Sequence, residues 1–252
     1  MNRFCRSMNT RGFPDFKLHL AQSLANGTPY VNRNVDEDDS VEAYTGKIFE
    51  SAMASLDHVR QSLDKSAVNR AVDLLTQAKK IALFTDPGKK NLKIAFFGLG
   101  SSAAVAHDAM NKFFRFNVPV IYSDDIVLQR MSCMNCNDDD VVVLISHTGR
   151  TKSLVELAQL ARENDAMVIA LTSAGTPLAR EATLAITLDV PEDTDIYMPM
   201  VSRLAQLTVI DVLATGFTLR RGAKFRDNLK RVKEALKESR FDKELLIRSD
   251  DR

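Results

Sequence analysis

The sequence lacks the residues that would place it in several special classes of protein. Its 252 residues contain three cysteines and no tryptophan, too few thiols for the disulfide framework of a small secreted protein. The longest wholly apolar run, residues 166–171, is far shorter than the ~20 residues of a membrane helix. No basic start precedes an apolar run, as it would in a secretory signal. These absences predict a cytoplasmic protein with no membrane partner.

The net charge is also close to zero, but it is the sum of segments with opposite charge. Lysine and arginine number 34 against 33 acids, which gives a formal charge of +1. The segment charges are +3 for 1–20, −4 for 21–50, +3 for 51–91, −6 for 92–219 and +5 for 220–252. Such asymmetry is expected when one part of a chain meets phosphates and another does not. A solvated surface with local bias is the alternative for the C-terminal segment.

From residue 92 onward, short apolar runs alternate with amphipathic stretches. The runs are 93–97, 118–122, 141–145, 167–171 and 184–188. Largely apolar runs suit strands buried on both faces, and spacings of roughly 17–26 residues leave room for the crossover helices that parallel strands need. The pattern predicts an α/β fold with a doubly wound, parallel, five-stranded sheet of the flavodoxin-like three-layer αβα kind.

The part of the chain before the sheet has two characters. Residues 21–40 have the composition of a linker, with turn formers and an acidic run. Apolar residues over 41–80 recur at three- and four-residue steps, which predicts helices, and Asp64 or Ser66 is the expected N-cap of the second one.

A near-repeat precedes the first strand. The string at 80–84 is almost duplicated at 93–97, with 85–91 between them. Only the second copy leads into a glycine loop. We therefore take it as the sheet strand and residues 85–91 as an inserted loop.

The first candidate site is the loop Gly98-Leu99-Gly100-Ser101-Ser102-Ala103. Open parallel sheets bind ligands beyond the carboxyl ends of their strands. Glycines let the backbone approach an anion, and the following helix offers N–H groups. The string also fits the dinucleotide fingerprint, with Asp124 and Asp125 about 20 residues further on. A nicotinamide enzyme therefore remains an alternative.

The second candidate site is Ser146-His147-Thr148-Gly149-Arg150-Thr151-Lys152, after the third strand. Hydroxyls and backbone N–H groups around a glycine at a helix start can bind phosphate without a metal. A dinucleotide fold needs only one such cradle, so a phosphorylated sugar suits two loops better. The alternative is that the hydroxyls only cap the helix.

These loops resemble the sugar isomerase (SIS) domain, a phosphosugar-binding module. Longer strings resemble the RpiR family of transcriptional regulators over nearly the whole chain. They lie at 106–115, 190–195, 198–207 and from 220 to 241. The resemblance implies a homodimer that binds operator DNA through a helix-turn-helix domain and senses a sugar phosphate in its SIS domain. It suggests 2-keto-3-deoxy-6-phosphogluconate as the effector.

The resemblance also implies the site residues. The effector site would contain Gly100, Ser101, Ser102, Ser146, His147, Thr148, Gly149, Thr151 and Ser202. Arg3 and Arg6 match arginines of the DNA-recognition helix. Arg150, Lys152 and Arg203 are the candidates for the effector carboxylate.

The resemblance divides the chain into five parts. These are a helix-turn-helix remnant at 1–20, a linker at 21–40, a helical lead-in at 41–91, the SIS core at 92–220 and a basic helical segment at 221–252. Residues 2–7 resemble only the second half of a recognition helix. Because so short a segment cannot hold itself helical, we expect this chain to bind operator DNA poorly.

No catalytic, cofactor or metal site is predicted. Lys152 and Ser153 stand where SIS isomerases usually place a glutamate, and isomerisation needs a general base. A sensor is therefore favoured, with a phosphosugar aldose–ketose isomerase as the alternative. His107 is assigned a structural or surface role. Cys133 and Cys136 lack further zinc ligands nearby and are interpreted as ordinary thiols.

Overall fold

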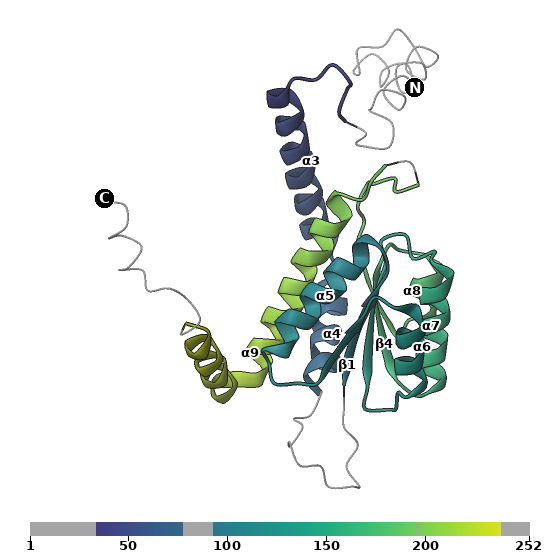
Figure 1. The fold of residues 1–252 in the computed structure, drawn as a ribbon, viewed down its shortest axis with the longest axis vertical. Coiled ribbons are helices and arrows are strands. Elements are labelled where there is room, and N and C mark those ends of the chain that lie inside the picture. The colour runs from purple at the N-terminus through teal and green to yellow at the C-terminus, as the bar shows by residue number, and fades with distance from the viewer. Residues whose placement is uncertain (1–33, 78–92, 196, 238–252) are drawn as a thin grey trace, which may run out of the picture. The chain divides into compact units, whose positions relative to one another are not determined.

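The structure is a computed structural model that describes residues 34–77, 93–195 and 197–237 (Figure 1). The described chain forms two compact units. The first contains the residues up to Ser62 together with Asp189–Ala205, and the second contains Leu63–Leu188 and the chain from Gln206 onward. No helix among the described residues is long and apolar enough to cross a membrane. The segments 1–33, 85–91 and 238–252, with Arg3 and Arg6, lie outside the described residues.

The second unit is built on a parallel five-stranded sheet of order β2-β1-β3-β4-β5. Its strands are β1 (Ile94–Gly98), β2 (Val120–Ser123), β3 (Val141–Ile145), β4 (Met167–Thr172) and β5 (Leu184–Thr187). This is the flavodoxin-like order, so the predicted fold class is confirmed. The expectation that all five strands are buried on both faces is wrong. The burial holds for β1, β3 and β4, whereas β2 is half-buried throughout and β5 alternates, because both lie at sheet edges.

Helices cover both faces of the sheet. The helices of this unit are α4 (Lys65–Gln77), α5 (Ser101–Phe114), α6 (Ile126–Met134), α7 (Lys152–Glu163), α8 (Pro177–Glu181) and the larger part of α9 (Val201–Lys237). Figure 1 shows α6, α7 and α8 on one side of the strands and α4, α5 and α9 on the other. Asp64 is the N-cap of α4, since its carboxylate accepts the Ser66 N–H at 2.8 Å, which confirms one of the two expected caps.

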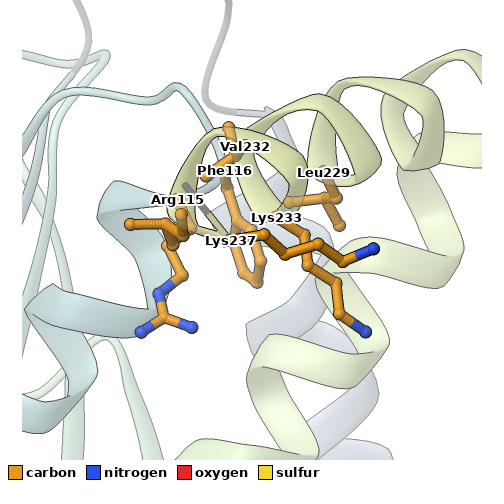
Figure 2. Close-up of a pocket in the computed structure, with 7 residues that line it drawn as sticks. Arg115, Phe116, Leu229, Val232, Lys233 and Lys237 are labelled. Atoms are coloured by element: carbon orange, nitrogen blue, oxygen red, sulfur yellow. The ribbon is translucent and has the colours of Figure 1, made fainter. Parts of the chain in front are cut away.

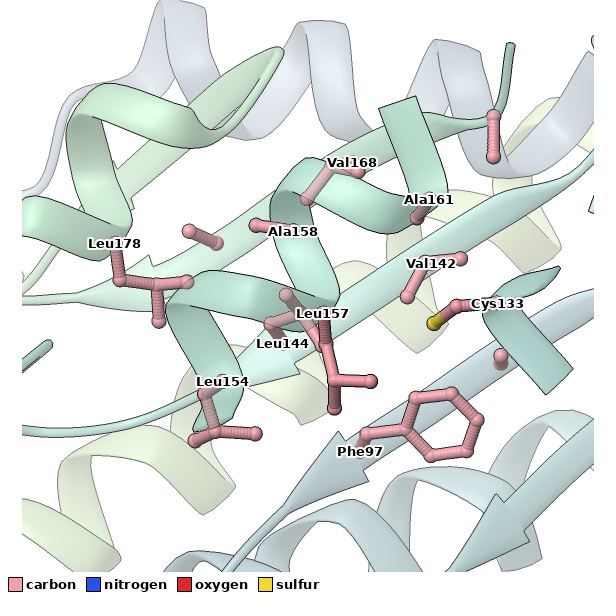
Figure 3. Close-up of a cluster of buried hydrophobic side chains, with 13 residues drawn as sticks. Phe97, Cys133, Val142, Leu144, Leu154, Leu157, Ala158, Ala161, Val168 and Leu178 are labelled. Atoms are coloured by element: carbon pink, nitrogen blue, oxygen red, sulfur yellow. The ribbon is translucent and has the colours of Figure 1, made fainter. Parts of the chain in front are cut away.

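Two cores result because alternate strand residues point to opposite faces. On the α6–α8 side, strand residues such as Phe97 and Leu144 pack with Leu154, Leu157 and Cys133 (Figure 3). The opposite core is aromatic. Its rings come from β1, α5, the turn after α5 and α9, with centroid separations of 5.1–5.7 Å, and are Phe96, Phe113, Phe116, Phe217 and Phe225.

Helix α9 contains a kink at Gly222. The backbone angles there are φ 76° and ψ −166°, in a region that essentially only glycine adopts. The helix therefore consists of a packed stretch and a basic stretch that leaves in another direction.

The first unit contains α3 (Val41–Ser62). Ser40 Oγ accepts the Ala43 N–H at 3.2 Å at the start of this helix. Lys47 Nζ lies 2.9 Å from Asp36 and 2.7 Å from Asp39, so the described part of the acidic run packs back on the helix that follows it. In the same unit, His58 Nε2 lies 3.3 Å from Asp189 Oδ2.

Candidate functional site

The two predicted loops lie side by side. They follow β1 and β3, which are paired strands, with Gly98 opposite Ile145 in the register. The strand order reverses between β1 and β3, and such a switch point is where open α/β sheets bind ligands. The sheet therefore places both loops at the same edge, beyond the carboxyl ends of its strands.

The first loop is shaped by its glycines. A Cβ at Gly98 would lie 2.6 Å from the backbone oxygen of Ser102, so only glycine lets the first turn of α5 approach β1 so closely. Gly100 precedes α5 with φ +57°, and no side chain of the described residues caps that helix start. At the start of this helix, Ser101 is half-buried and Ser102 is buried. The loop thus presents backbone and hydroxyl groups at a helix N-terminus, the arrangement that suits an anion.

The second loop is closed by internal hydrogen bonds. Ser146, only 5% exposed, accepts the Gly149 N–H on its Oγ at 3.2 Å. Thr148 Oγ1 accepts the Arg150 N–H at 3.4 Å. Thr151 is the N-cap of α7 but makes no side-chain cap bond, so its hydroxyl is not used as the capping alternative would require.

A third loop, which the sequence analysis missed, supports the second. Ser173 donates both its N–H and its hydroxyl to the His147 carbonyl, at 3.1 and 2.7 Å. The Leu178 N–H donates to Gly149 O at 3.1 Å. The segment 173–176 also follows a parallel strand and contains hydroxyls and a glycine, so the strand-end rule could have found it.

Gln129 was also missed. This side chain on α6 is 0% exposed and donates from Nε2 to Ser123 O at 2.7 Å and to Gly98 O at 3.4 Å. It therefore connects the carboxyl ends of β2 and β1 beneath the first loop. Nothing in the local sequence distinguishes it from a surface glutamine.

Ser202 belongs to the first unit, at the start of α9. It is 2% exposed, and the carboxylate of Glu192 accepts the N–H groups of Met200, Val201 and Ser202 at 2.7, 2.7 and 3.1 Å. Burial raises the pKa of Glu192, but the hydrogen bonds from the Ser202 side chain and from these N–H groups outweigh it, so the pKa is lowered overall. A carboxylate of the chain itself therefore occupies this helix N-terminus.

Other candidates are accounted for by structural contacts. Asp125 caps α6 by accepting the Val127 and Leu128 N–H groups at 2.8 and 2.9 Å, which removes the support it lent to a dinucleotide site. His107 packs on Tyr122 with ring centroids 4.9 Å apart.

The two thiols of the CxxC motif show no sign of a metal site. Burial, the largest cause, raises the pKa of Cys133 to about 12 and that of Cys136 to about 11. No group of three potential metal ligands occurs among the residues that the structure describes.

Comparisons with known proteins define first the class and then the family. The SIS domain model matches residues 89–216. Over its full length the chain is 89% identical to the HTH-type transcriptional regulator HexR of Escherichia coli K12, of which it covers 83%. It is 53% identical to HexR of Pseudomonas aeruginosa PAO1 over 96% of this chain and 80% of that protein.

One solved structure shows the same fold. The Vibrio vulnificus NanR protein complexed with ManNAc-6P superposes with a TM-score of 0.66 at 22% identity, covering 96% of this chain and 81% of that one. The family model and the two HexR relatives define the class as transcriptional regulators with a SIS domain. Within it, the chain belongs to the HexR family of HTH-type transcriptional regulators.

Proposed function

We propose that this chain is a sugar-phosphate-responsive transcriptional regulator that works as a cytoplasmic homodimer. The main observation in support is that two loops rich in glycine and hydroxyl groups follow the neighbouring strands β1 and β3, where the strand order reverses. The regulatory role follows from the relatives, which are named transcriptional regulators. For operator DNA we propose binding through a helix-turn-helix domain, to which we assign Arg3 and Arg6.

The effector that suits the loops is a small sugar acid phosphate, and 2-keto-3-deoxy-6-phosphogluconate is our specific candidate. Ser102, Ser146 and Thr151 would hold its phosphate together with backbone N–H groups. Arg150 and Lys152, at the start of α7, supply positive charge for its carboxylate. Hydrogen bonds to ionised groups are the stronger kind, which suits a ligand with an anion at each end.

We further propose that the site senses rather than converts its ligand. Lys152 begins α7 and is followed by Ser153, so the position at which we expect an isomerase glutamate has no carboxylate. We assign His147, in the second loop, to effector contact rather than to proton transfer. Incubation of the chain with ketose and aldose phosphates should give no interconversion.

Calorimetric titration of the effector into Ser146→Ala tests the site. A lost hydrogen bond to an ionised phosphate costs about 1.5–3 kcal/mol, so affinity should fall roughly 10–150-fold. Thr218→Ala is the matched control, because its hydroxyl donates to Ala214 O within α9 at 2.9 Å and takes no part in the loops. Unchanged affinity in Ser146→Ala would refute the assignment, and turnover during titration would favour an isomerase.

A further inference from the structure

A hollow lies in the SIS-containing unit, between the end of α5 and the last part of α9 (Figure 2). Its volume is about 450 Å³. It is lined by Arg115, Phe116, Leu229, Val232, Lys233, Leu236 and Lys237. Three of these side chains are cationic, four are apolar, and none of the described residues that line it is acidic.

The hollow is built by the fold. Its floor is Phe116, whose ring stacks on Phe217 at 5.1 Å and 8° and meets Phe225 edge-on at 5.6 Å. Its outer wall is the stretch of α9 beyond Gly222, whose direction depends on a backbone conformation that glycine adopts. Ring contacts therefore hold the floor, and the outer wall takes its direction from the kink at Gly222.

The helical repeat of α9 places basic side chains toward the hollow and its acids elsewhere. Lys233 and Lys237 are four residues apart and share the face of α9 that lines the hollow. Figure 2 shows their amines and the Arg115 guanidinium on either side of the Phe116 ring. The acids of this stretch do not line the hollow, and one of them, Asp227, lies 3.6 Å from Lys230. The hollow therefore combines an apolar floor with a cationic rim.

We propose that this hollow is a second ligand site, for a small amphipathic anion. The ligand would place a phosphate or carboxylate among Arg115, Lys233 and Lys237, and an aromatic or aliphatic body on Phe116. Charge complementarity selects the anion, and the apolar floor excludes a bare sugar phosphate, which has nothing to bury there. The volume lies within the range of small-molecule sites, about 300–1,000 Å³.

The site is separate from the effector loops. Helix α5 begins at Ser101 in the first loop and ends at Phe114, next to the hollow. Its 14 residues span roughly 21 Å at 1.5 Å per residue. One rigid helix thus joins the two sites, and a ligand in the hollow can be bound together with a sugar phosphate.

A matched pair of dyes tests the proposal on the whole chain. 1-Anilinonaphthalene-8-sulfonate is an aromatic anion, and N-phenyl-1-naphthylamine is the same body without the charge. We expect the sulfonate dye to bind saturably at one site per chain. Lys233→Glu should weaken it about tenfold or more, the effect of reversing one close charge. The affinity of the neutral dye should change less than about twofold in the same variant.

The controls separate the site from general effects. Arg231→Glu makes the same charge reversal two residues away, at a side chain that is exposed and does not line the hollow, and should leave both dyes nearly unchanged. Leu236→Gln should weaken both dyes, because it removes apolar wall. Ser146→Ala should alter neither, so that failure of the effector-loop assignment is distinguishable from failure here.

Three results would overturn the proposal. One is an equal effect of Lys233→Glu and Arg231→Glu. Another is displacement of the dye by 2-keto-3-deoxy-6-phosphogluconate in competition, which would place the dye in the loops. The third is a fall in dye stoichiometry as the chain self-associates, which would show that a second copy fills the hollow.

Discussion

Replacing Gly149 by alanine should damage the second loop in a way that the structure allows to be worked out. Gly149 has φ +57°, and a Cβ there would lie 2.5 Å from Thr172 Oγ1 and 2.6 Å from Thr176 Cβ. Gly100, in the first loop, has the same φ but nothing within 4 Å of its would-be Cβ. Both alanine variants therefore carry the strain of a positive φ, and Gly149→Ala adds crowding to it.

The magnitudes follow from that difference. Gly100 has φ 57° and ψ −130°, a sparsely populated region that costs a residue with a side chain about 1–3 kcal/mol, and this strain is the whole expected effect of the alanine there. Overpacking adds about 1–3 kcal/mol, so Gly149→Ala should lose about 2–6 kcal/mol of stability in total. A loss of 1 kcal/mol lowers the melting temperature of a chain of this size by roughly 2–4 °C. The melting temperature of Gly149→Ala should therefore lie clearly below that of Gly100→Ala.

Calorimetric melting of the two variants measures this difference. We also expect Gly149→Ala to weaken effector binding, since any shift of residue 149 disturbs its N–H bond to Ser146 Oγ. Equal melting temperatures for the two variants would refute the reasoning. They would mean that the side chains of Thr172 and Thr176 turn away from the new methyl group without cost.

Two further predictions concern titratable groups. Glu192→Gln should cost about 0.5–1 kcal/mol near neutral pH, the usual value of a charge at a helix N-terminus. Because the pKa of Glu192 is lowered in the fold, the stabilisation is full above its ordinary value of 4.5 and is lost as the pH falls below it. Melting curves of both proteins should therefore converge in acid, and a constant gap would contradict the assignment. Cys133 and Cys136, with pKa values raised to about 12 and about 11, should react with iodoacetamide at least a hundredfold more slowly than a free thiol of pKa about 8.5. Mass spectrometry of the alkylated peptides measures this, and rapid labelling of either folded thiol would count against it.

The sequence by itself determined the central strands and the chemistry of their loops. The apolar run at 141–145 coincides with β3, and that at 167–171 lies within β4, because strands covered on both faces leave no polar alternation. Glycines and hydroxyls directly after such runs indicated which loops to propose as the ligand site, since loops beyond parallel strands share one side of the sheet. The edge strand β2 was placed less well, because its half-buried residues carry a weaker pattern.

Only the tertiary structure decided which residues meet. It joined Gln129 to Gly98, crowded Gly149 against Thr172, and set the end of α5 beside the basic stretch of α9. Periodicity tells which face of an element is buried but not which neighbour covers it. These contacts depend on strand order and helix packing, and neither is encoded within a single stretch of the chain.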